Sequence, residues 1–141
     1  MNEANRQQYL KLALRILAAV FVFGFYLFTV VWPSGWVWHA GQSNYLQMMI
    51  AIYATLGVFL FLAAGNPERH LSLIAFTIWS SIVHGGTMAV QSMMNSEHRA
   101  HMYGDVPALF IAAALLSWLS PRAFTLPLAR NGAQAPRLLS P

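Results

Sequence analysis

The stretch SSIVHGGTMAVQ, residues 80–91, places polar side chains inside a segment that is apolar enough to cross a membrane. When residues 77–95 are arranged as a helix, most of the polar side chains of this range and one methionine form a single stripe: Thr77, Ser80, Ser81, His84, Met88, Gln91 and Asn95. A polar group that faces lipid is costly, so we expect the stripe to face the other helices. His84 lies near the middle of the segment and needs hydrogen-bond partners there, which makes it the centre of a candidate site.

Two interpretations of this stripe stay open. The first is packing, because small residues recur at every fourth position and allow close helix approach: Thr77, Ser81, Gly85 and Ala89. The second is a ligand cavity or an ion path, since ionisable residues inside membrane spans often mark functional sites. The candidate ligand-binding residues for this second interpretation are His84, Gln91, Ser80, Tyr53 and Met88, and Trp79 or Trp38 would add aromatic surface.

The segment EHRAHMYGD, residues 97–105, contains a second candidate site. If it is helical, His98, His101 and Asp105 lie on one face, and two imidazoles with a carboxylate can chelate zinc, iron or copper. The alternative is a solvated helix end. Six methionines map to the same half of the chain's helices, near His39 and the two other histidines: Met48, Met49, Met88, Met93, Met94 and Met102. Thioethers beside imidazoles suit copper(I), although methionine also fills gaps between helices.

The composition predicts the helices that position these residues. Of 141 residues, 57% are hydrophobic and 9% are charged, against about 25% charged in a soluble domain. A helix needs about 20 residues to cross a bilayer, and we place four spans at about residues 12–32, 45–64, 71–94 and 97–120. The predicted fold is therefore all-α, an antiparallel four-helix transmembrane bundle formed by residues 1–120.

Three connections complete this prediction. The turn GNPERH, residues 65–70, is short and predicts a tight hairpin between the second and third spans. The apolar run from Val106 is too short to cross alone, so we expect a longer helix that starts near Ser96 and is kinked by Pro107; the alternative is a short helix capped by Asp105. Residues 121–141 contain four prolines and scattered arginines, and are expected to form a flexible basic tail.

The positions of the basic residues explain the net charge of +4. Only Arg99 falls in the two connections expected on the outer side, while the other basic residues lie on the opposite side: Arg6, Lys11, Arg15, Arg69, Arg122, Arg130 and Arg137. This positive-inside pattern predicts cytoplasmic N- and C-termini in a bacterial inner membrane. We expect the lipid bilayer as partner, with a second copy of the chain or another membrane protein, and no nucleic acid.

The segments YATLGVFLFLA (53–63), the Asn66-Pro67 turn and HLSLIAFTIWSSIVH (70–84) resemble a family of small bacterial four-span membrane proteins that has no assigned function. The resemblance covers about a third of the chain. It implies the fold without implying a reaction.

The sequence contains no cysteine, which excludes disulfides and thiolate metal sites, and it carries no common catalytic motif. We therefore expect a small membrane protein that is not an enzyme. It would be an accessory subunit or a binder of a small apolar ligand in an outward-facing cavity near His84. The alternative is a metal or redox protein that uses His98, His101 and Asp105, and a third hypothesis is an oligomeric transporter. The sequence does not identify a cofactor.

Overall fold

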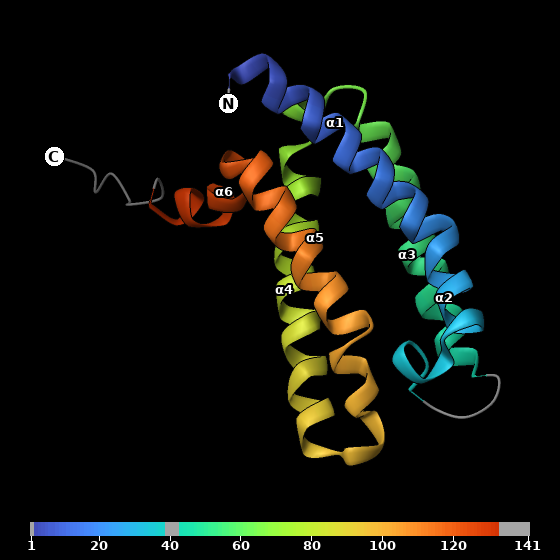
Figure 1. Ribbon diagram of the computed structural model, residues 1–141. Helices are drawn as coiled ribbons and strands as arrows, with labels where there is room; N and C mark the ends of the chain where they lie inside the picture. Colours follow the sequence, from blue (N-terminus) through green and yellow to red (C-terminus); the bar gives the residue numbers. More distant parts are fainter. Residues whose placement is uncertain (1, 39–42, 133–141) are drawn as a thin grey trace, which may run out of the picture.

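The computed structural model describes the backbone of residues 2–38 and 43–132, and the side chains of these residues as far as 126. Its long helices form two antiparallel pairs, which lie close together at one end and spread apart toward the other (Figure 1). Four helical segments are long and apolar enough to cross a membrane, at Glu3–Val31, Asn44–Ala63, Pro67–Met94 and Ser96–Leu119. The predicted all-α four-helix bundle is confirmed for the described part of the chain.

The first of these segments contains a change of helical pitch. It consists of α1 (Glu3–Ala19), a π-helical turn (Val20–Gly24) and α2 (Phe25–Val31), and Asn2 caps its start by accepting a bond from the backbone of Asn5. The π-helical turn packs on α3 (Asn44–Ala63) at Gly57, where a Cβ atom would lie 2.9 Å from the carbonyl oxygen of Ala18. Only glycine allows the two helices to approach this closely.

The four long segments associate as two pairs. The α1 helix packs mainly on α3, and α4 (Leu71–Met94) packs mainly on α5 (Asp105–Leu119). The connection between α3 and α4 is short, as predicted, and includes a 3-10 turn at Pro67–His70. However, α3 and α4 diverge from this turn and make few contacts, so the predicted tight hairpin is wrong (Figure 1). Instead, α3 buries its apolar face mainly against α1, and α4 buries its apolar face mainly against α5.

The fourth segment differs from the predicted kinked helix. Asn95 caps a 3-10 helix at Ser96–Met102, the chain breaks at Tyr103 and Gly104, and α5 begins at Asp105 with Pro107 in its first turn. A Cβ atom on Gly104 would collide with the carbonyl oxygen of Gly35, in the 3-10 turn Pro33–Gly35. This contact between the two connections at one end of the bundle interrupts the helix, and Pro107 does not kink it.

The segment after Ser120 also differs from the prediction of a flexible tail. Residues Pro121–Gly132 form α6, which turns away from α5 and packs on α4 (Figure 1). Trp79 Nε1 donates a hydrogen bond to the carbonyl oxygen of Phe124 at 3.1 Å, and the two rings stack with centroids 5.2 Å apart. Residues 133–141 of the predicted tail lie outside the described residues.

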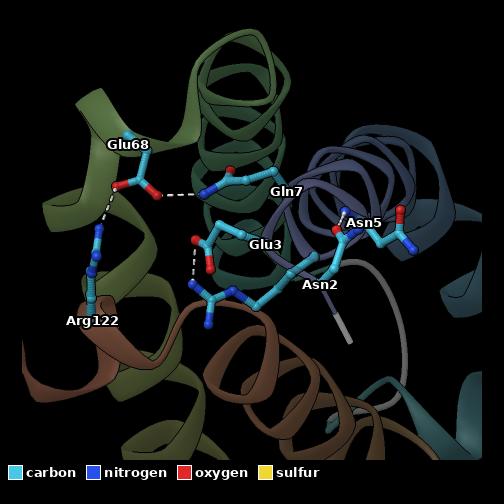
Figure 2. A network of polar contacts seen from close by, with 7 residues as sticks. Asn2, Glu3, Asn5, Gln7, Glu68 and Arg122 are labelled. Carbon is cyan, nitrogen blue, oxygen red and sulfur yellow. Dashed lines mark hydrogen bonds and ion pairs between the residues drawn. The ribbon is translucent and has the colours of Figure 1, made fainter.

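The end of the bundle that holds the N-terminus and α6 is closed by polar contacts (Figure 2). Glu68, in the turn between α3 and α4, accepts a hydrogen bond from Gln7 on α1 and lies 3.7 Å from Arg122 on α6. Below this network lies the main core, whose largest buried side chains come from α1, α3, α4 and α5: Leu10, Leu14, Leu60, Ile74, Ile78 and Leu116. The two helix pairs are therefore joined by dense apolar packing in this half of the molecule.

Candidate functional site

The opposite half of the bundle contains a cavity of about 210 Å³. Both helix pairs contribute to its lining, together with the connection after α2, and the lining is mostly apolar. The lining includes Phe21, Phe25, Trp36, Trp38, Met49, Tyr53, His84, Met88, Gln91, Asp105, Ala108 and Leu109. The cavity thus lies where the helix pairs separate, beyond the main core.

Aromatic rings form one wall of the cavity. Tyr53 of α3 stacks on Phe25, with centroids 5.0 Å apart, and meets the edge of Phe21 at 5.3 Å. Trp36 in turn lies edge-on to Phe25 at 5.7 Å. The π-helical turn lies between Ala19 and Phe25, so this local change of pitch sets how the phenylalanine rings meet Tyr53. Such interlocked rings give the wall a fixed shape.

The α4 stripe divides between packing and the cavity. The small-residue seam packs on α5, because a Cβ atom on Gly85 would lie 3.3 Å from Leu109 Cβ. His84 and Gln91 line the cavity, and the His84 ring lies edge-on to Tyr53 at 6.1 Å. Within the described part of the chain, His84 forms no hydrogen bond. The packing interpretation therefore accounts for the small residues of α4, and the cavity interpretation accounts for the positions of His84 and Gln91.

Four of the five predicted ligand-binding residues lie together around the cavity, namely His84, Gln91, Tyr53 and Met88. Ser80 does not belong to the lining, and its hydroxyl donates to the carbonyl oxygen of Thr77 at 3.3 Å within α4. One turn of helix separates it from His84, and the helix carries it toward the main core. A helical wheel predicts which residues share one side of α4, but it does not predict the depth at which the cavity ends.

Asp105 is the acidic residue of the cavity, and two side chains hold its carboxylate. His101 Nδ1 lies 2.9 Å from Asp105 Oδ2, and Trp38 Nε1 donates to the same oxygen at 3.3 Å. The Trp38 ring also stacks on the His101 ring, with centroids 4.2 Å apart. His101 is 1% exposed and Asp105 4%, so this arrangement is withdrawn from solvent.

The predicted metal ligands are not gathered around one point. His101 and Asp105 are paired, but the His98 ring lies against Trp38 at 4.7 Å and 5.9 Å from the His101 ring. Among the described residues, no group of three or more histidine or acidic side chains converges as metal ligands would. The helical face assumed for these residues does not exist, because residues 96–102 form a 3-10 helix and the chain breaks before Asp105.

The methionines are also dispersed. Met49 and Met88 line the cavity and Met102 packs beside Met88, whereas the remaining three are exposed on the outside of the bundle: Met48, Met93 and Met94. His39 lies outside the described residues. Met49 and Met88 therefore contribute apolar surface to the cavity, and Met102 contributes to the packing beside it.

Of the two tryptophans expected to supply aromatic surface, Trp38 lines the cavity, whereas Trp79 packs on Phe124. Asp105 was missed as a cavity residue, because it was assigned to the metal site. The signal that could have found it is the pair of glycines, Gly35 and Gly104, which lets two connections far apart in the sequence meet. That meeting brings Trp38 over the start of α5.

The fold and the cavity define the class of the molecule: a helical bundle with four potential membrane spans and a partly open, mostly apolar cavity between its helices. The chain belongs to a Family of unknown function (DUF6632), whose family model matches residues 4–137. This confirms the resemblance to a four-span family without an assigned function. No curated protein and no solved structure matches the chain.

Proposed function

We propose that this protein is a non-enzymatic integral membrane protein that binds a small, mainly apolar ligand in the cavity between its helix pairs. The observation that carries the proposal is the cavity itself. Its volume of about 210 Å³ exceeds that of a packing defect, and its apolar lining carries only a few polar groups. Small-molecule sites in proteins have this character, with apolar walls for affinity and few polar groups for orientation.

The polar groups of the lining are suited to orienting a ligand. Tyr53, His84, Gln91 and Asp105 belong to three different helices, so a ligand that contacts them all would bridge the two helix pairs. Binding is favoured over catalysis because the sequence carries no common catalytic motif.

The placement in the membrane follows from the charges. Arg6, Arg69 and Arg122 belong to the end that holds the N-terminus and α6, whereas Arg99 lies at the other end. By the positive-inside rule, the first end would face the cytoplasm of a bacterial inner membrane. The cavity would then lie in the outer half of the bilayer, with lipid around the exposed apolar faces of the helices.

The proposal is tested by filling the cavity. Ala108 lines it and is itself exposed, so Ala108→Phe adds a ring to the cavity without entering the main core. Ala114→Phe is the matched control, because Ala114 is exposed on the same helix and does not line the cavity. Native mass spectrometry of protein purified from its membrane should detect a bound small molecule in the wild type and in Ala114→Phe. The same molecule should be lost from Ala108→Phe.

The proposal fails if no small molecule accompanies the wild-type protein and none of a panel of small apolar compounds raises its melting temperature. It also fails if Ala108→Phe keeps the bound molecule as well as the control does. Melting temperatures of both variants without ligand show whether either substitution disturbs the fold.

A further inference from the structure

Asp105 has a buried oxygen that no group in the described residues contacts through a hydrogen bond. The residue is 4% exposed, and its Oδ2 atom takes both contacts, from Trp38 Nε1 and His101 Nδ1. Its Oδ1 atom is buried and meets no donor at full hydrogen-bond geometry among the described residues, although the backbone N–H of Val106 also interacts with the carboxylate. A carboxylate only accepts hydrogen bonds, and a buried acceptor is costly to leave without a donor.

The position of Asp105 makes the cavity the source of that donor. Asp105 and Trp38 belong to the lining, whereas His101 does not. The Asp105 carboxylate is therefore held at Oδ2 by one residue of the lining and by one residue behind it. Both partners bind Oδ2, so Oδ1 is the oxygen left for a ligand donor. Because Oδ1 is buried, the carboxylate must turn toward the cavity when the ligand binds.

The surroundings of Asp105 favour a cationic donor. The cavity lining contains the aromatic rings of Phe25, Trp36, Trp38 and Tyr53, and it contains no lysine or arginine among the described residues. An ammonium group is attracted to the faces of such rings as well as to a carboxylate, and a charged donor forms the stronger hydrogen bond. An anionic ligand would meet the carboxylate, and no lysine or arginine of the lining would compensate its charge.

We propose that the cavity binds a small, mainly apolar amine whose protonated amino group donates a hydrogen bond to Asp105 Oδ1. This inference rests on the proposed function, since it names the ligand class of the same cavity. The apolar part of the amine lies against the rings and Leu109, and His84 and Gln91 contact the ligand on the α4 side. His101 and Trp38 are positioning residues, because they orient Asp105.

The cavity volume sets the size of the test ligand. An apolar cavity of about 150 Å³ holds benzene, so about 210 Å³ accommodates a phenyl ring with a short side chain. We therefore choose 2-phenylethylamine as the probe. Ethylbenzene serves as the comparison without a polar group, and acetophenone as the comparison that only accepts hydrogen bonds.

The experiment measures the affinity of the three compounds for the full chain in nanodiscs of zwitterionic lipid, from the concentration dependence of the melting temperature. Ala108→Phe provides the background from partition into the lipid. A hydrogen bond to a charged group is expected to make 2-phenylethylamine bind about 10- to 100-fold more tightly than ethylbenzene. In Asp105→Asn this advantage should disappear, while the affinity for ethylbenzene stays unchanged.

The outcomes separate this inference from the proposed function. If ethylbenzene binds as tightly as the amine, or acetophenone binds more tightly, the amine assignment is wrong while the ligand cavity stands. If the amine keeps its advantage in Asp105→Asn, Asp105 is not its anchor and the inference is likewise overturned. If none of the compounds binds more tightly to the wild type than to Ala108→Phe, both proposals fail. The comparison of ligands on the wild type decides the case even if Asp105→Asn does not fold.

Discussion

Trp38 shows how one side chain joins parts of the chain that the sequence keeps apart. Its ring stacks on His101, and its Nε1 atom donates to Asp105, 67 positions further along the chain. Because the connection after α2 has no long helix of its own to anchor it, these contacts hold it over the cavity. The Trp38 indole, together with Trp36 of the same connection, therefore shapes the cavity at this end.

The first prediction tests this indole. Trp38→Phe keeps an aromatic ring over His101 but removes the donor to Asp105 Oδ2, and should lower the free energy of unfolding by about 1–3 kcal/mol. Trp118→Phe is the control, since Trp118 is 68% exposed on α5 and loses the same atoms. Denaturant unfolding in one detergent compares the two. Equal stabilities of the two variants would show that the bond to Asp105 contributes nothing measurable.

At the scale of elements, one glycine sets how closely the first span approaches α3. A Cβ atom on Gly57 would lie 2.9 Å from both the Ala18 oxygen and Val22 Cγ2, next to the π-helical turn. In contrast, a Cβ atom on Gly86 of α4 would meet nothing within 4 Å. Two glycines in helix interiors thus have opposite roles, although both cost helix propensity.

The second prediction uses this contrast. Gly57→Ala should destabilise the protein by about 1–3 kcal/mol, because backbone and side chains must move to admit the methyl group. Gly86→Ala should stabilise it by about 0.4–1 kcal/mol, through the reduced freedom of the unfolded chain. Thermal unfolding of both variants measures the difference. A stable Gly57→Ala protein would mean that the helices can separate there without cost.

At the scale of the whole molecule, the two halves of the bundle have different packing. Aliphatic side chains join both helix pairs in the half that holds the N-terminus and α6, while the other half contains the cavity. The α3 and α4 helices diverge from their short turn, which opens the space between the pairs (Figure 1). The main core and the cavity thus lie at opposite ends of the same four helices.

The third prediction concerns the orientation of these ends. Because the chain lacks cysteine, single cysteines can be introduced and labelled without a background. Ser96→Cys should react with a membrane-impermeant maleimide added outside spheroplasts, since Ser96 is exposed at the end opposite α6 and the start of α1. Thr125→Cys, exposed on α6, should react only after the membrane is opened. The reverse pattern would contradict the orientation inferred from the basic residues.

The sequence by itself determined the number of long helices and most of the α4 residues that face inward, although Gln91 and Asn95 at the end of the stripe are exposed. These properties depend on hydrophobicity and helical periodicity, which act within about 20 residues and are visible in any one segment. His84, Gln91, Met88 and Tyr53 could therefore be selected as neighbours of one cavity. The turn after α3 was short as predicted, for the same local reason.

Only the tertiary structure decided which helices pair, where the cavity ends and what Asp105 contacts. The pairing of α1 with α3 and of α4 with α5 depends on how side chains fit between helices, as at Gly57 and Gly85. Sequence periodicity does not encode that fit. The break before α5 depends on the meeting of Gly35 and Gly104, which are 69 positions apart. Backbone atoms of one connection occupy the space that a continuous helix would need. Asp105 therefore does not share a helical face with His98 and His101, as predicted, but lines the cavity.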